Sequence, residues 1–95
     1  MRYNVGEHGI LNVNLDNLDE WNIRDFKKLL DEMDYWKYKN DYKSALDDLF
    51  VAAYKLEDSY SRMFKISHVK RYEVIKQRME RFMQLINEKR GKLNG

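Results

Sequence analysis

The segment DYKSALDDLFVAAYKLEDSYSRMF, residues 41–64, decides the fold predicted for this chain. Its apolar residues recur every three or four positions, which is the spacing of an amphipathic α-helix. The apolar stripe comprises Tyr42, Ala45, Leu46, Leu49, Phe50, Ala53, Leu56, Tyr60, Met63 and Phe64. A helix of this length spans roughly 35 Å at ~1.5 Å per residue. Because the stripe is too wide to face solvent, we expect flanking segments to cover it.

A second amphipathic helix is predicted over residues 22–39. Asn22 suits the N-cap position, and Asp25 places a carboxylate in the first turn, where the helix dipole favours negative charge. Trp21 and Phe26 occupy the N′ and N4 positions of a hydrophobic staple. The buried face of this helix is expected to hold Phe26, Leu29, Leu30, Met33 and Trp36. The short break before residue 41 favours antiparallel packing on the central helix.

A third helix is predicted over residues 67–91, with Ser67 as its N-cap and Gly91 as the residue that follows its C-terminus. Its apolar seam consists of Tyr72, Ile75, Met79, Phe82 and Ile86, widened by Val69 and Met83. These residues alternate three and four apart, as in a coiled coil. The seam can pack on the central helix or, if the third helix projects, on another chain.

The first fifteen residues follow a different pattern. Tyr3 and Val5 alternate with polar residues before a GEHG stretch, and Leu11, Val13 and Leu15 do so after it. Period two with a glycine-containing loop predicts a β-hairpin, with an extended arm as the alternative. The fold class expected is therefore mainly α: a three-helix antiparallel bundle, with a short N-terminal β-hairpin or arm packed on it, in a single domain over residues 1–95.

The composition and motifs of the chain argue against catalysis. The chain has no cysteine, and it lacks GxxxxGK[ST], GxGxxG, GxSxG and HExxH patterns. The histidines, His8 and His68, have no partner at metal-ligand spacing, and the carboxylate pairs fall mostly on solvated faces. We therefore expect no enzyme activity, no cofactor or metal, and no small-molecule substrate. No apolar run approaches the ~20 residues of a membrane span, so we expect no membrane partner and a cytoplasmic location.

Charge is divided unevenly along the chain. Residues 1–58 carry eight Lys/Arg and thirteen Asp/Glu, a balance of −5, whereas residues 59–95 carry ten and three, a balance of +7. On the third helix a basic strip is predicted on the side away from the seam, formed by Lys70, Arg71, Arg78, Arg81 and Lys92. This strip can be a solvated face, pair with the acidic half of the same chain, contact an acidic protein, or contact phosphates.

Aromatic residues suggest a protein-binding surface. The side chains expected to project away from the core, and so to meet a partner, are Tyr35, Tyr38, Tyr54, Val74 and Leu85. Tyrosine and arginine commonly anchor protein interfaces. The leading hypothesis is a small non-enzymatic protein-binding module that regulates or inhibits a larger protein machine. The alternatives are nucleic-acid binding through the basic strip and a homodimer formed through the apolar seam. No family motif matches residue by residue, although the short, cysteine-free, Lys- and Tyr-rich chain is typical of accessory proteins of phages and mobile elements.

Overall fold

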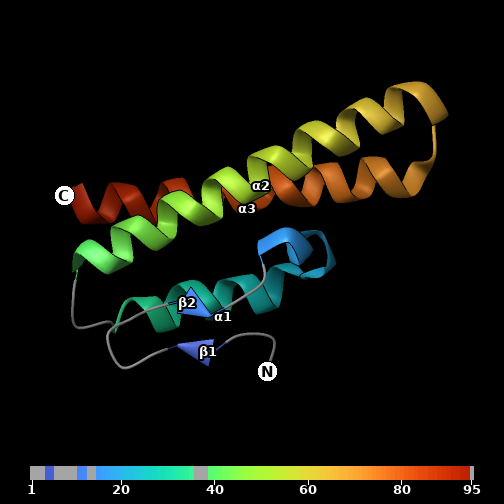
Figure 1. Ribbon diagram of the computed structural model, residues 1–95. Helices are drawn as coiled ribbons and strands as arrows, with labels where there is room; N and C mark the ends of the chain where they lie inside the picture. The colour runs from blue at the N-terminus through green and yellow to red at the C-terminus, as the bar shows by residue number, and fades with distance from the viewer. Residues whose placement is uncertain (1–3, 6–10, 13–14, 36–38, 95) are drawn as a thin grey trace.

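The computed structural model describes residues 4–5, 11–12, 15–35 and 39–94, with side chains over 15–35 and 42–92. This part of the chain is a helical bundle (Figure 1). Its elements are strands β1 (Asn4–Val5) and β2 (Leu11–Asn12), the 3-10 helix η1 (Leu15–Glu20), and helices α1 (Ile23–Met33), α2 (Lys39–Ser67) and α3 (Lys70–Asn94).

The two long helices form an antiparallel hairpin that gives the molecule its length. α2 and α3 run side by side, while α1 and η1 lie along one side of them (Figure 1). The molecule is elongated, with a longest dimension of 45 Å. α1 and η1 cover only part of this length, so the outer end of the hairpin projects beyond them (Figure 1). The prediction that the third helix either folds back or projects is thus resolved: it folds back on α2.

The core lies where all these helices meet. The buried side chains are Leu18, Trp21, Phe26, Leu29, Leu30, Met33, Tyr42, Ala45, Leu46, Leu49, Ala53, Met79, Phe82, Leu85 and Ile86. At its centre the rings of Phe26 and Phe82 stack, with centroids 4.1 Å apart and planes 3° from parallel. This contact joins α1 to α3 across a separation of 56 residues in the sequence.

Burial along the predicted stripe of α2 decreases toward the outer end. The stripe residues from Tyr42 to Ala53 are buried, except that Phe50 is half-buried. Beyond Ala53 the stripe residues are only half-buried, and Met63 is 37% exposed. The periodicity of the stripe is uniform, but the cover is not, because α1 and η1 end before the hairpin does (Figure 1).

The start of α1 follows the prediction, whereas its end does not. The side-chain oxygen of Asn22 accepts a hydrogen bond from the backbone N–H of Asp25 at 2.7 Å, as expected of an N-cap. The helix ends at Met33 rather than at residue 39, and Asp34 and Tyr35 form a turn. Residues 36–38, which include Trp36 and Tyr38, lie outside the described residues.

The reversal between α2 and α3 differs from the one predicted. His68 has a φ of 57°, and its N–H donates to the Phe64 carbonyl at 2.8 Å, which closes the C-terminus of α2. Ser67 is therefore the last residue of α2 rather than the N-cap that opens the third helix, and its hydroxyl donates to the Met63 carbonyl. α3 begins at Lys70.

Two further predicted helix ends are displaced. α2 begins at Lys39 rather than at residue 41. α3 continues through Gly91 to Asn94, so Gly91 lies within the helix and does not terminate it. Open space surrounds the position that a Cβ at Gly91 would occupy, so nothing in the fold requires a glycine there.

The two strands pair antiparallel. Asn4 lies opposite Asn12, and Val5 lies opposite Leu11. Leu15, predicted to close the second arm of the hairpin, instead begins η1. The other residues of the predicted hairpin, including its loop, lie outside the described residues. Packing of this segment against the helices stays a prediction.

Candidate interaction surface

The residues predicted to bind a partner do not gather into one surface. Tyr35 follows α1 and is 89% exposed, whereas Tyr54 lies on the outer side of α2 and is 57% exposed. Val74 is 49% exposed on α3. Tyr38 lies outside the described residues. Leu85 is buried, so its predicted exposure is wrong.

The predicted basic strip is also interrupted. Its middle faces α1, because α3 packs against α1 as well as against α2. There Arg78 is half-buried, and its Nη1 donates to the backbone carbonyl of Trp21 at 2.9 Å. Leu85, on the same side of α3, belongs to the core. Lys70 and Arg71 lie at the outer end of the helix and Lys92 near its C-terminus, so the five basic residues do not form one continuous surface.

A shallow groove between the N-terminus of α1 and the side of α3 unites members of both predicted sets. We call it the α1–α3 groove; it is lined by Asn22, Ile23, Val74, Gln77, Arg78 and Arg81. Ile23 is 37% exposed, so it and Val74 present apolar surface from two different helices. Arg81 donates to the side-chain oxygen of Gln84 at 3.1 Å. Within the described part of the chain, neither Arg78 nor Arg81 forms an ion pair.

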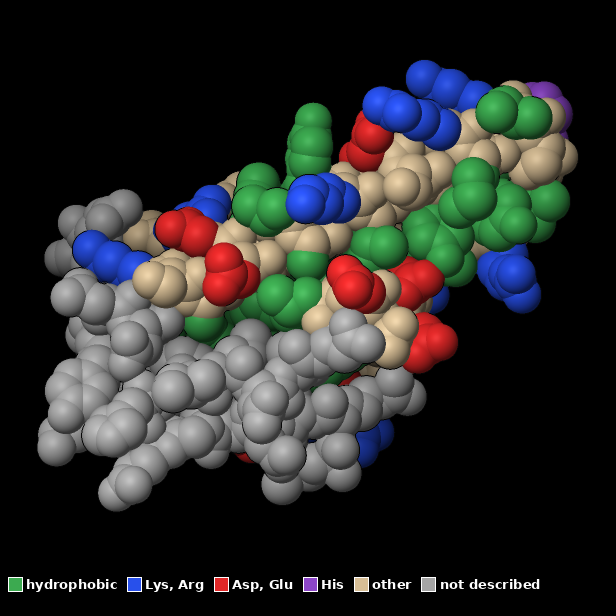
Figure 2. Space-filling model, viewed as in Figure 1, with side chains coloured by type: hydrophobic (Ala, Val, Ile, Leu, Met, Phe, Trp, Pro, Cys, Tyr) green, Lys and Arg blue, Asp and Glu red, His purple; other side chains and the backbone are tan. Residues whose placement is uncertain are grey.

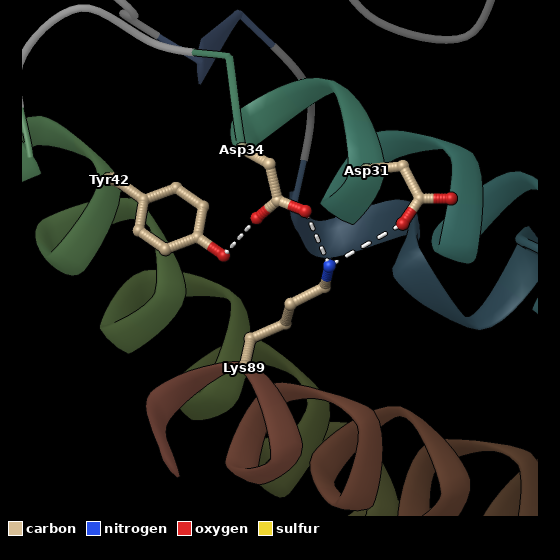
Figure 3. Close-up of polar contacts among 4 residues, drawn as sticks. All are labelled: Asp31, Asp34, Tyr42 and Lys89. Carbon is tan, nitrogen blue, oxygen red and sulfur yellow. Dashed lines mark hydrogen bonds and ion pairs between the residues drawn. The ribbon is translucent and has the colours of Figure 1, made fainter. Parts of the chain in front are cut away.

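A second polar feature joins all three helices near the C-terminus of α1, at the end of that helix away from the groove (Figure 3). We call it the Asp34 cluster; it consists of Asp31, Asp34, Tyr42 and Lys89. Lys89 of α3 donates to Asp34 at 2.6 Å and lies 3.4 Å from Asp31 of α1. The hydroxyl of Tyr42, on α2, donates to the other oxygen of Asp34 at 2.8 Å. Asp34 directly follows α1, so these contacts hold the end of that helix against its neighbours.

The charges in this cluster support one another. Burial raises the pKa of Asp34, but the hydrogen bonds from Lys89 and Tyr42 outweigh it and leave the pKa below its usual value. Burial lowers the pKa of Lys89, but its contacts with Asp34 and Asp31 outweigh that effect and raise the pKa overall. Burial and the hydrogen bond to Asp34 raise the pKa of Tyr42. The cluster therefore favours an ionised Asp34 beside a neutral Tyr42.

Lys89→Met should lower the free energy of unfolding at pH 7 by about 1 kcal/mol, since one partner of the exposed Asp34 carboxylate is lost. The folded-state pKa of Asp34 lies below its unfolded value near 3.8, so its stabilising effect is present above that pH and is lost as pH falls through the folded pKa. The deficit of the variant should therefore shrink between about pH 4 and pH 2. Urea unfolding at pH 7 and at pH 2.5 measures this difference.

The matched control is Lys70→Met, which removes an exposed pair with Glu73 three residues along the same helix. This change should alter stability by less than ~0.5 kcal/mol at either pH. A Lys89→Met deficit that is equal at pH 7 and pH 2.5 would contradict the role assigned to Asp34.

Other pairs join the acidic first half of the chain to the basic second half. Arg90 of α3 pairs with Asp47 of α2, and its guanidinium lies 4.7 Å from the centre of the Phe50 ring. Together with the contacts of Lys89, this pair shows that some cations of the basic second half form ion pairs with acids of the first half. Intramolecular pairing was one of the alternatives left open by the sequence.

The outer end of the α2–α3 hairpin carries exposed apolar and basic side chains side by side. We call it the hairpin tip and define it by Met63, Ile66 and Val69 together with Arg62, Lys65, Lys70 and Arg71. Figure 2 shows hydrophobic side chains gathered at this end of the hairpin, with cationic side chains beside them. Ile66 is 85% exposed, more than any other large aliphatic side chain that the structure describes.

Sequence reasoning missed the tip as a unit. It assigned Met63 to the apolar stripe of the central helix and Val69 to the seam of the third, and it gave Ile66 no role. A signal was present, because Ile66 lies between Lys65 and Ser67 and off the apolar stripe. The exposure of all three depends on where α1 and η1 end, which periodicity does not encode.

In the described residues, no group of three or more His, Asp or Glu side chains is arranged to hold a metal ion. Nor does any described helix have both the length and the hydrophobicity needed to cross a bilayer. No family model, curated protein or solved structure matches this chain.

Proposed function

We propose that this chain is a non-enzymatic protein-binding module that regulates or inhibits a larger protein machine. One observation carries the proposal: the α1–α3 groove combines exposed apolar surface from two helices with two arginines. Ile23 and Val74 supply the apolar surface, and Arg78 and Arg81 flank it. Arginine and apolar side chains at the centre of a concave surface are typical of protein interfaces.

The charge of the groove indicates the chemistry of the partner. Neither guanidinium is paired with a carboxylate among the described side chains, so a partner can supply one without first breaking an ion pair. Arginine also forms planar, two-pronged hydrogen bonds with carboxylates. The partner segment expected here has an apolar side chain that covers Val74 and an Asp or Glu that reaches Arg81.

Nucleic-acid binding stays the alternative proposal, but the geometry supports it less. A duplex would need several cations spaced along its phosphates, whereas the middle of the strip is turned toward α1. Contacts with phosphates would also leave the apolar side chains of Ile23 and Val74 exposed to solvent.

A homodimer formed through the apolar seam is supported least. Met79, Phe82 and Ile86 of that seam are fully buried within their own chain. A second copy could reach them only if the bundle opened. Homodimerisation would therefore require a surface other than the predicted one.

A photo-crosslinking amino acid at position 74 tests the proposal in cells that express the protein. Val74 is half exposed, so the substitution should leave the bundle folded, which circular dichroism can verify. A discrete crosslinked protein should form at position 74, and its yield should fall at least ~5-fold when Arg81→Glu is added. The control places the same group at Val51, which is equally exposed on α2 but lies outside the groove.

Identical crosslinks from positions 51 and 74 would show that the groove is not the contact. Crosslinks to nucleic acid alone would favour the alternative. In that case, binding should weaken steeply with salt, and Arg78→Ala with Arg81→Ala should flatten the salt dependence.

A further inference from the structure

The hairpin tip is separated from the rest of the bundle. The hydroxyl of Tyr60 donates to Asp19 of η1 at 2.5 Å, which ties α2 to η1 at that point. This hydrogen bond, together with burial, raises the pKa of Tyr60 to about 12, so the tie is intact at neutral pH. α2 then continues for seven residues to Ser67, about 10 Å at ~1.5 Å per residue. The tip is thus a convex projection about two helical turns long (Figure 1).

The apolar side chains of the tip are placed at its outermost part. Ile66 lies in the last turn of α2, Met63 lies one turn before it, and Val69 lies between the two helices. Their exposed fractions are 85%, 37% and 42%. The half-buried Phe64 ring packs edge-on against the ring of the exposed His68, with centroids 5.9 Å apart, so the two sides of the turn are in contact. The exposed apolar surface is therefore held on a packed turn.

The Lys, Arg, Asp and Glu side chains within residues 59–72 are all cationic. Residues 59–72 contain Arg62, Lys65, Lys70 and Arg71 and no Asp or Glu. The acids that border this segment are Asp58, which pairs with Arg62, and Glu73, which pairs with Lys70. Within the described residues Lys65 and Arg71 form no ion pair; Arg71 instead lies 5.9 Å from the centre of the Tyr72 ring. Two cations of the tip therefore remain uncompensated.

The shape, exposed apolar side chains and cations of the tip together favour a lipid bilayer as its partner. A convex tip does not need a matching pocket in order to bury its apolar side chains in the interface of a bilayer. Its cations then meet the phosphates and carboxylates of anionic headgroups, and peripheral binding requires both signals, an apolar insertion and basic charge. Asp19 contacts Tyr60, seven residues before the end of α2, so this acid lies behind the outermost turn of the tip.

We propose that the hairpin tip docks on anionic lipid surfaces, with Ile66 inserted at the headgroup boundary and Lys65 and Arg71 in contact with anionic headgroups. This activity is independent of the protein contact proposed for the α1–α3 groove. It departs from the expectation of no membrane partner, which depends only on the absence of a spanning segment. Nucleic acid explains the tip less well, because phosphates would use the cations and leave the exposed Ile66, Met63 and Val69 in water.

Cosedimentation of the full chain with vesicles tests the proposal. The probes are vesicles of phosphatidylcholine alone and vesicles with 30% phosphatidylserine, each at 50 mM and 500 mM salt. The chain should bind the phosphatidylserine vesicles at least ~10-fold more tightly at low salt, since each basic residue near an anionic surface contributes about fivefold. Ile66→Asp should weaken this binding at least ~10-fold, and Lys65→Glu with Arg71→Glu should abolish the preference for phosphatidylserine.

Two controls keep the test specific. Val51→Asp introduces the same charge on α2 at an exposed apolar position outside the tip, and it should change binding less than ~2-fold. Val74→Asp alters the groove, and vesicle binding should survive this change, because the tip binds independently of the groove. Circular dichroism should be unchanged in each variant, because all the altered side chains are exposed.

Three results would overturn the proposal. They are an absence of wild-type binding to phosphatidylserine vesicles at 50 mM salt, equal binding to both vesicle types, and Ile66→Asp binding as tightly as wild type. Binding of a DNA duplex that depends on Lys65 and Arg71 but not on Ile66, without vesicle binding, would assign the tip to nucleic acid. An environment-sensitive fluorophore at position 66 gives an independent readout, since its emission should shift to shorter wavelength only on insertion.

Discussion

Phe82→Ala is expected to lower the free energy of unfolding by about 4 kcal/mol. The Phe82 ring is fully buried and stacks on Phe26, so truncation removes apolar burial, opens a cavity and breaks the contact between α3 and α1. Urea unfolding followed by circular dichroism measures the loss. Melting should occur at a much lower temperature, since each kcal/mol corresponds to roughly 4–8 °C in a domain of this size.

The matched control for Phe82→Ala is Tyr54→Ala, which removes an aromatic ring from the exposed side of α2. This change should lower the free energy of unfolding by less than ~0.5 kcal/mol. A loss below ~1.5 kcal/mol for Phe82→Ala would mean that the two rings do not form the centre of the core.

Leu85→Ala is expected to lower the free energy of unfolding by about 2 kcal/mol, at the low end for a buried leucine because the side chain lies at the edge of the core. Val74→Ala should change it by less than ~0.5 kcal/mol, since Val74 is half exposed. The sequence assigns both residues to the same outward face of the third helix. Chemical unfolding of the two variants therefore tests whether Leu85 lies in the core. Equally small losses for both variants would mean that Leu85 is exposed, as the sequence predicted.

Much of the helical architecture follows from local signals. The N-cap at Asn22 and the buried faces of α1 and α2 depend on periodicity and on residues within one helical turn of each other, so they could be predicted. The apolar seam of the third helix is predicted for the same reason, and Met79, Phe82 and Ile86 are indeed in the core.

The face of α3 that contacts α1 could not be predicted in this way. A helical wheel drawn around one apolar seam assumes that the helix packs on one other helix, whereas α3 packs on both α2 and α1. The direction of the second neighbour depends on how α1 lies across the hairpin, which is a tertiary property. Leu85 and Arg78 lie on that side, so the same omission made Leu85 appear exposed and left the contact of Arg78 with the Trp21 carbonyl unforeseen.

The reversal between the long helices was mispredicted for a local reason. A serine can cap the N-terminus of a helix, or it can lie in the last turn of a helix and donate its hydroxyl to the carbonyl four residues earlier. Ser67 does the second. The left-handed conformation that ends α2 falls on His68, whereas glycine or asparagine is the usual signal for it. Three residues therefore separate the predicted start of the third helix from the observed one.

Because α1 and η1 cover only part of the α2–α3 hairpin, the two ends of the molecule should differ in their resistance to local unfolding. Near the Phe26–Phe82 stack, separating α2 from α3 exposes the core, so backbone amides there can exchange with solvent only when the whole bundle unfolds. Beyond Tyr60 the two helices hold mainly each other, and a brief local opening there leaves the core intact. Amide hydrogens from Met63 to Tyr72 should therefore exchange well before those around Phe82. The end of the molecule proposed to meet a lipid surface can thus rearrange without unfolding the rest.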